Sequence, residues 1–276
     1  EIGSVIRSGE GKTGQVFLEG FRLVGDAVRS GIEPLRALVA RRVFERMEAG
    51  SQDLPAGFPG DASGGLLVFE DALFDSLCGT ETPQGIAMLA RSPAGKRLAD
   101  LDPVSVSSAG IRCLVLESIQ DPGNLGTLIR LADAFGFNPV ILLTGCADPY
   151  SQKVLRSAMG SVFHLTLFRS QSWPDVLEWL SVHRLPLVAG DLAGIPLPEA
   201  SLPVSGALVI GNEGRGLSEE ARKASDLRVA TPMPGHAESL NAAMAAAILA
   251  YTMSAASKDP PHFGNGAPRA EKETKP

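Results

Sequence analysis

The stretch DPGNLGTLIRLADAFGF, residues 121–137, lies two residues after the apolar run CLVLES at residues 113–118. The run predicts a buried strand, and the stretch predicts a glycine turn followed by a helix over residues 124–135. The apolar side chains of that helix share one face, and Gly136 suits its end. Asn124 and Arg130 lie off this face, where Asn124 can cap the helix and Arg130 can pair with Asp133. Either residue can instead belong to a functional site.

Apolar runs and helical patterns continue to alternate from residue 111 to about residue 257. Further strands are predicted at PVILLT, VFHLTL, PLVAGDL, GALVIG and LRVA, and further helices over residues 152–158, 172–183, 218–224 and 238–257. This order predicts an α/β fold with a mainly parallel sheet and helices on both faces.

A smaller α/β unit is predicted ahead of it, over residues 1–93. Its strands are expected at QVFLEG, LRALVA, GLLVFE and GIAMLAR, with a helix at FRLVGDAVRSG. Residues 94–110 show little periodicity and predict a linker, and the Pro-, Gly- and charge-rich residues 258–276 predict a disordered tail. The chain opens on Glu1, so we expect it to be a fragment of a longer protein.

Composition narrows the classes of function. The net charge of -6 and the pI near 5.3 argue against a protein that binds nucleic acid by bulk attraction, so RNA binding would need a local patch. The three cysteines are widely spaced and form no CxxC, and the histidines form no HExxH. We therefore expect reduced thiols, no metal and an intracellular protein. No apolar run approaches the ~18 residues of a membrane span.

The segment GEGKTG, residues 9–14, matches the dinucleotide pattern GxGxxG and ends like a phosphate-binding P-loop. Both motifs require a helix directly after the glycines. Here QVFLEG follows, which predicts a strand, so a flexible basic loop is the favoured interpretation. Its Lys12 and Arg7 could still touch phosphate.

Three Gly- or Pro-rich loops follow predicted strands, at IQDPGN, GNEGRGLS and TPMPGHAESLN. Ligands of parallel α/β sheets bind beyond the carboxyl ends of the strands, so the three loops predict a pocket built largely from main chain. Each polar residue also has an ordinary interpretation: Ser239 as a helix cap, Glu213 as a turn residue, His236 as a bystander. Asn241 lies past the expected cap, where its poor helix propensity calls for another reason.

The motifs NLGTLIR, IGNEGRGLS and PMPGHAESLNAAMAAAILAY resemble the three signatures of the SpoU family of RNA ribose 2'-O-methyltransferases, in the SPOUT superfamily. The resemblance covers residues 111 to about 257. The phrases FLEGFRLVGDAV and TPQGIAMLA more loosely resemble a small RNA-binding domain similar to ribosomal protein L30e. The resemblance implies a C-terminal trefoil knot, S-adenosyl-L-methionine as cofactor, and a homodimer with the site near its interface.

The family's site residues carry over by motif. The catalytic set is Asn124 and Arg130 from the first signature, Glu213 from the second, and Ser239 and Asn241 from the third. The implied cofactor-binding residues are Ile210, Gly211, Asn212, Gly214, Met233, Ser239, Leu240 and Asn241. Arginine stays protonated at neutral pH, so we expect Arg130 to stabilise a developing alkoxide or to grip a phosphate. Glu213 could orient Arg130, and Ser239 could hold the hydroxyl. One departure is the AAM that follows Asn241, where many relatives have Val-Ser-Val.

The expected partner is RNA, with rRNA favoured over tRNA. No association with a membrane is expected. Two other functions stay open: a catalytically silent RNA-binding or ribosome-assembly protein, and a nucleotide-binding enzyme using GEGKTG. The protein would be cytoplasmic in a bacterium and mitochondrial or plastid in a eukaryote. A set of N-terminal arginines could line an RNA path or form a solvated surface with Glu33, Glu45 and Glu48; the set is Arg22, Arg29, Arg36, Arg41, Arg42 and Arg46.

Overall fold

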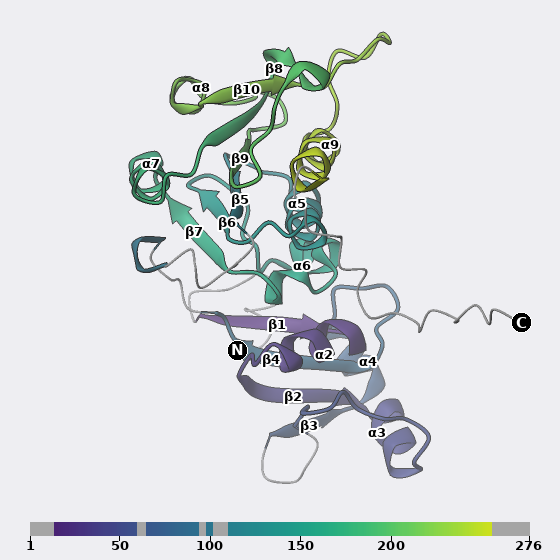
Figure 1. Ribbon diagram of the computed structural model, residues 1–276. Helices are drawn as coiled ribbons and strands as arrows, with labels where there is room; N and C mark the ends of the chain where they lie inside the picture. The colour runs from purple at the N-terminus through teal and green to yellow at the C-terminus, as the bar shows by residue number, and fades with distance from the viewer. Residues whose placement is uncertain (1–13, 60–64, 94–97, 102–109, 256–276) are drawn as a thin grey trace, which may run out of the picture.

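The computed structural model describes residues 14–59, 65–93, 98–101 and 110–255 (Figure 1). Its first sheet has the order β1-β4-β2-β3. β4 runs antiparallel to both β1 and β2, and β3 pairs parallel with β2. The elements of this unit are β1 (Gln15–Glu19), α2 (Phe21–Arg29), β2 (Pro34–Ala40), α3 (Arg41–Glu48), β3 (Leu66–Phe69), α4 (Asp71–Leu77) and β4 (Ile86–Arg91). The predicted strands and the first helix are confirmed, whereas α3 and α4 were not predicted.

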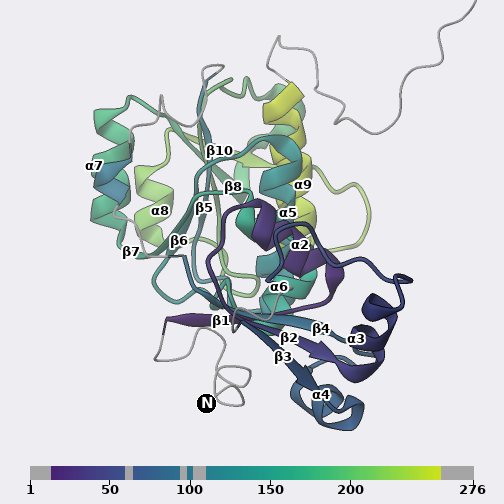
Figure 2. The ribbon, with the colours of Figure 1, turned by 90° about the horizontal axis from the view of Figure 1, so that it is seen from below.

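The second sheet has six parallel strands in the order β10-β8-β9-β5-β6-β7. Its elements are β5 (Arg112–Leu116), α5 (Pro122–Phe135), β6 (Val140–Leu143), α6 (Gln152–Ala158), β7 (Leu167–Gln171), α7 (Trp173–Val182), β8 (Leu187–Pro196), β9 (Gly206–Ile210), α8 (Glu219–Ala224), β10 (Leu227–Ala230) and α9 (Ala242–Ala255), with short 3-10 turns at η1 (Leu98–Asp100), η3 (Ser161–Phe163) and η4 (Leu197–Glu199). Helices α7 and α8 cover one face, and α5, α6 and α9 cover the other (Figure 2). The predicted α/β class is confirmed.

Several predicted boundaries were wrong. The strand expected at VFHLTL lies further along the chain, because residues 161–163 form a 3-10 turn and β7 begins at Leu167. Helix α5 begins at Pro122, and α9 begins at Ala242 instead of residue 238. The predicted linker contains η1, whose Leu98 is buried beside α7, where Trp179 donates to the Leu101 carbonyl. Most of GEGKTG and the predicted tail lie outside the described residues.

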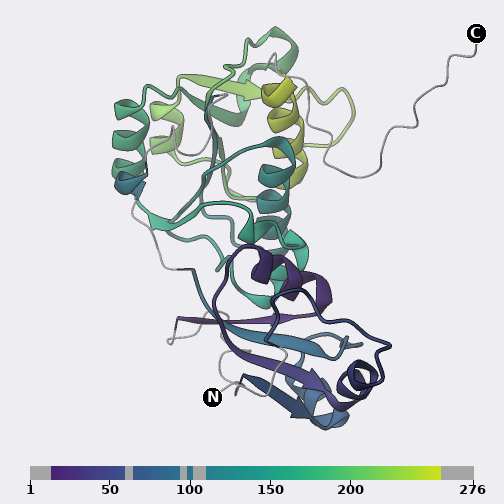
Figure 3. The ribbon, with the colours of Figure 1, turned by 60° about the horizontal axis from the view of Figure 1, so that its bottom comes forward.

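The two sheets meet through α6 (Figure 3). The Gln152 side chain donates to the carbonyl of Phe17 in β1, at 2.6 Å. A methyl group on Gly160 would come within 2.2 Å of the Asp26 carboxylate in α2, so the chains approach closely there. One apolar cluster runs from Val16 and Leu18 across this contact to Val154 and Leu155. The second sheet is therefore anchored to the N-terminal unit through α6 and the turn that follows it. In the described residues, no helix is both long and apolar enough to cross a membrane.

Candidate active site

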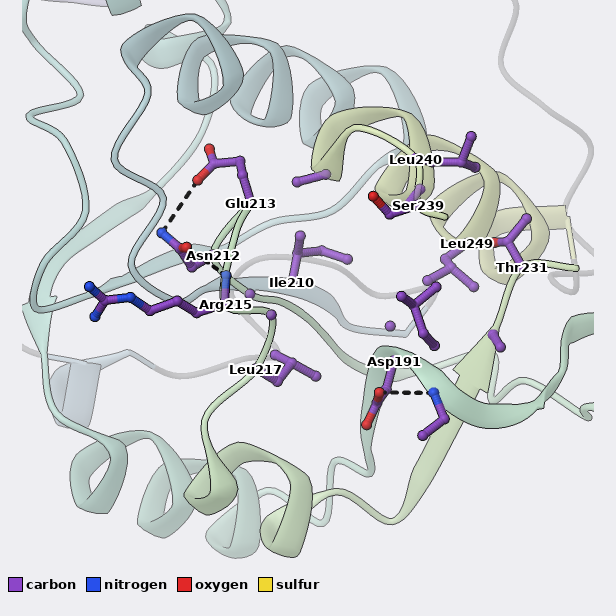
Figure 4. Close-up of a pocket in the computed structure, with 18 of the residues that line it drawn as sticks. Asp191, Ile210, Asn212, Glu213, Arg215, Leu217, Thr231, Ser239, Leu240 and Leu249 are labelled. Atoms are coloured by element: carbon purple, nitrogen blue, oxygen red, sulfur yellow. Dashed lines mark hydrogen bonds between the residues drawn. The ribbon is translucent and has the colours of Figure 1, made fainter. Parts of the chain in front are cut away.

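A cavity of about 530 Å³ opens between the irregular middle of β8 (residues 190–193), the loops that follow β9 and β10, and the first turns of α9 (Figure 4). Seven of the eight predicted cofactor residues line it: Ile210, Gly211, Asn212, Gly214, Met233, Ser239 and Leu240. Asn241 is not among the lining residues and directly precedes α9. The second and third of the three predicted loops therefore form the cavity, and residues 190–193 within β8 complete it.

Internal hydrogen bonds hold the loop after β9 in one shape. Asn212 and Gly216 pair through both of their backbone groups, at 3.1 and 2.9 Å. The Asn212 side chain accepts from the amides of Gly214 and Arg215, each at 3.0 Å, and donates to the Ser118 carbonyl at 2.8 Å. A methyl group on Gly211 would lie 2.5 Å from the Gly216 carbonyl oxygen, so that position requires glycine. The loop thus presents fixed main-chain groups to the cavity.

Three predicted catalytic side chains form one hydrogen-bonded chain. Asn241 donates from Nδ2 to Asn124 Oδ1 at 3.0 Å, and Asn124 donates from Nδ2 to Glu213 Oε1 at 3.0 Å. One residue comes from each of the three predicted loops. Each member fixes the next, so the Asn124 amide and the Glu213 carboxylate hold defined orientations at the edge of the cavity.

The capping roles differ from those predicted. Asp121 caps α5 by accepting from the Asn124 amide at 2.8 Å, so Asn124 is not a cap and its side chain is free to reach Glu213. That backbone hydrogen bond and then Lys153, 3.2 Å away, lower the pKa of Asp121. At α9 the cap is Asn241, whose Oδ1 accepts from the Ala243 amide at 2.9 Å, and not Ser239. The Asn241 side chain therefore has two roles: Oδ1 caps α9, and Nδ2 donates a hydrogen bond to Asn124.

Arg130 is not part of this chain. Its side chain is exposed on α5, outside the cavity, and it forms no hydrogen bond or ion pair within the described part of the chain. The expected pair with Asp133 is wrong, because Asp133 contacts His164 Nδ1 at 2.9 Å. Glu213 is bound to Asn124 and Asn212, and does not orient Arg130 in this chain. Ser239 lines the cavity as an exposed side chain.

Glu117 is a structural part of the site that sequence reasoning missed. It is 8% exposed at the end of β5. One carboxylate oxygen accepts from the Trp173 indole at 2.6 Å, and the other from the Ser218 amide at 2.9 Å. Ser218 caps α8 directly after the cavity loop, so Glu117 fixes the end of that loop to α7. A glutamate that ends an apolar strand was the signal available in CLVLES.

Most of the N-terminal arginines lie in ion pairs. Arg22 and Arg29 approach Asp26, Arg41 pairs with Glu70, and Arg42 contacts Asp71 and Asp75. These four arginines therefore pair with acidic residues of their own unit, as on a solvated, mixed-charge surface. Arg36 and Arg46 donate to main-chain carbonyls. Among the described residues, no group of three His, Cys, Asp or Glu side chains could hold a metal ion.

Comparison with known proteins finds relatives that match most of this chain. The SpoU rRNA Methylase family matches residues 112–251. The 23S rRNA (guanosine(2553)-2'-O)-methyltransferase RlmP of Bacillus subtilis is 35% identical over 87% of this chain and 88% of its own length. The structure of the SpoU methyltransferase AviRb from Streptomyces viridochromogenes, in complex with AdoMet, aligns with a TM-score of 0.76 and 27% identity over 92% of this chain and 95% of its own. An AdoMet-bound rRNA methyltransferase from Sinorhizobium meliloti aligns with a TM-score of 0.75 and 26% identity over 91% and 92%.

Proposed function

Because the chain belongs to the SpoU rRNA methylase family, we propose that it transfers a methyl group from S-adenosyl-L-methionine to a ribose 2'-hydroxyl in rRNA. The observation that carries the proposal is the Asn241–Asn124–Glu213 chain at the edge of a main-chain-lined cavity. An rRNA substrate would place the protein beside the ribosomes of its own compartment.

The cavity suits the cofactor by size and by chemistry. Its volume of about 530 Å³ lies in the range of small-molecule sites. Ile210 and Leu249 offer apolar walls, while Gly211 and Gly214 bring main-chain groups close. The cofactor supplies a methyl group that a positive sulfonium activates, so the protein's tasks are to align the 2'-hydroxyl and to help remove its proton.

Asn124 and Glu213 are proposed to contact the acceptor nucleotide. The hydrogen bonds from Asn241 and to Glu213 hold the Asn124 amide in place. The second Glu213 oxygen accepts only a long hydrogen bond, at 3.4 Å, from the Asn212 side-chain amide. A carboxylate in that position can accept a hydrogen bond from the ribose hydroxyl. Ser239, on the cavity wall, is proposed to hold the same hydroxyl.

A homodimer is proposed to bring Arg130 into the site. Arg130 is exposed and lies outside its own chain's cavity, so a cation that acts on the reacting ribose would have to reach the cavity of a second copy. The exposed face of α9 offers an apolar contact surface beside α5: Met244 is 60% exposed, Ile248 37% and Tyr251 62%. Phe135 of α5 packs edge-on against Tyr251 at 6.0 Å and extends that surface.

The remaining family features belong to the same proposal. Residues 1–93 are proposed as the L30e-like RNA-binding domain, residues 94–110 as its linker, and residues 111–257 as the methyltransferase domain, with a trefoil knot in its C-terminal part. The assignment of residues 1–93 is supported by the position of the N-terminal sheet. This sheet contacts α6, which packs beside the end of α5 that carries Asn124.

The proposal is tested by calorimetry and by mapping of 2'-O-methyl groups. We expect the protein to bind S-adenosyl-L-methionine but not ATP or NAD, and one rRNA nucleotide to lose its methyl group when the gene is deleted. Complementation with Asn124→Ala should not restore the methyl group. If the methyl group is lost from tRNA instead, the substrate is tRNA. Cofactor binding without any lost RNA methyl group would favour a silent RNA-binding protein.

Mixed dimers test the role of Arg130. Arg130→Ala and Asn124→Ala subunits should each be inactive alone. If Arg130 acts across the interface, co-expression should restore about a quarter of wild-type activity, because half of the dimers are mixed and each has one intact site. Arg130→Ala with Asn241→Ala serves as a second pair. No recovery in either pair would place Arg130 in its own chain's site.

A further inference from the structure

Two buried polar atoms of the cavity lack hydrogen-bond partners. They are Asp191 Oδ2 and Thr231 Oγ1, and both residues line the cavity. The other described side-chain atoms of this kind belong to residues outside the cavity. Folded proteins leave few buried polar atoms unpaired, so two in one cavity point to groups that a ligand supplies.

Asp191 is held firmly in place. Its side chain is 8% exposed, and Oδ1 accepts from the Ala193 amide at 3.1 Å. Oδ2 lies 3.3 Å from Arg222 Nε and 3.5 Å from Arg228 Nη1, but it accepts a hydrogen bond from neither. Three elements, β8, α8 and β10, therefore fix this carboxylate at the wall of the cavity.

The charges around Asp191 select the kind of ligand group. The two guanidinium groups already compensate the Asp191 carboxylate, and Arg222 also pairs with Glu219 at 2.9 Å. The cluster therefore has no excess negative charge to attract the sulfonium or the ammonium group of the cofactor. It does offer a charge-assisted acceptor to a neutral donor, and Thr231 offers a second acceptor.

We propose that Asp191 and Thr231 bind the ribose hydroxyls of the cofactor's nucleoside and so set the enzyme's preference for a ribonucleoside cofactor. The proposal rests on the proposed function. Acidic side chains bind ribose hydroxyls in the same way in dinucleotide sites. Asp191 and Thr231 lie on the side of the cavity away from Glu213 (Figure 4). A nucleoside held there leaves the sulfonium end of the cofactor free to reach toward Asn124 and Glu213.

The test measures binding of S-adenosylhomocysteine and of its 2'-deoxy and 3'-deoxy analogues by calorimetry. The wild-type protein should bind one deoxy analogue about tenfold more weakly, as loss of a hydrogen bond to a charged group predicts. Asp191→Asn should weaken the binding of S-adenosylhomocysteine by a similar factor. The same variant should bind that deoxy analogue as tightly as the wild-type protein does. Thr231→Val keeps the side-chain shape and should weaken the binding of S-adenosylhomocysteine roughly threefold. It should leave the binding of one deoxy analogue unchanged.

Arg228→Gln is the matched control, because it breaks the same ion-pair cluster without lining the cavity. It should leave the ratio between parent and deoxy ligands unchanged. If Asp191→Asn weakens parent and deoxy ligands equally, Asp191 acts only through the ion pairs and the inference is wrong while the proposed function stands. If the wild-type protein binds no S-adenosylhomocysteine, both this inference and the proposed function are wrong.

Discussion

Gly126 of α5 packs directly against α6, so Gly126→Ala should separate the two helices. A methyl group there would stand 1.9 Å from Ser157 Oγ and 2.7 Å from the Val154 carbonyl oxygen. Alanine in place of glycine ordinarily favours a helix by about 1 kcal/mol. Overpacking costs about 1–3 kcal/mol, and rotation of Ser157 would lose a hydrogen bond of about 1 kcal/mol. The expected net effect is a loss of about 1–3 kcal/mol in the free energy of unfolding.

The substitution should also reach the site, because α5 carries Asn124. A shift of about 1 Å in a positioning group can cost about 100-fold in rate. The backbone of the loop after β9 is held by its own hydrogen bonds and by Ser118, so we expect it to keep its shape. We expect kcat to fall at least about tenfold with nearly unchanged cofactor affinity. Urea unfolding and a methyl-transfer assay measure the two effects.

Two variants sharpen the comparison. Ser157→Ala in the same chain should restore part of the stability but not all of it, because the Val154 carbonyl still lies in the way. Thr127→Ala on the exposed side of α5 is the control and should be neutral or slightly stabilising. A Gly126→Ala protein as stable and as active as the wild type would refute the packing argument.

The two functions of Asn241 should separate in Asn241→Ser: serine keeps the cap, so unfolding in urea should change by less than about 0.5 kcal/mol, while methyl transfer falls at least tenfold because Asn124 loses its donor. Equal activity in Asn241→Ser and wild type would show that capping is its whole role. Because the pKa of Asp121 is lowered in the folded protein, its stabilising effect is complete above the ordinary Asp pKa of about 4 and is lost as the pH falls through the lowered value. The stability of Asp121→Asn, measured by urea unfolding from pH 5 to pH 2, should therefore fall less steeply than that of the wild type; identical slopes would contradict the assignment. Burial raises the pKa of Cys146 to about 11 and those of Cys78 and Cys113 to about 12, so Ellman's reagent at pH 8 should react slowly with the native protein and with three thiols after denaturation; rapid native labelling would count against the burial.

Short-range patterns predicted much of this protein. The apolar strand at residues 113–116 and the end of α5 at Gly136, which has a φ of 68°, depend on neighbouring residues alone. The loops around Asn124, Glu213 and Asn241 could be predicted because each one directly follows a strand that is evident in the sequence. Their convergence followed from the rule that parallel strands end at one edge of the sheet.

Other features could not be read from neighbours. Asp121, Asn124, Ser239 and Asn241 all have side chains that can cap a helix, and the sequence does not say which one meets a free amide. The strand at VFHLTL was misplaced because residues 161–163 turn against α2 and α5, a contact between segments far apart in the chain.

The sequence by itself determined the α/β class, the family and the polar residues of the three loops, because strand, turn and helix signals act over a few residues. Only the tertiary structure decided that Asn241 holds Asn124, that Glu117 anchors the cavity loop, and that Arg130 lies outside its own cavity. It also brought Asp191 and Thr231 to one wall. The physical reason is that hydrogen-bond partners and burial depend on the order and register of strands that are not neighbours in sequence, so a pair such as Glu117 and Ser218 exists only once the sheet has formed.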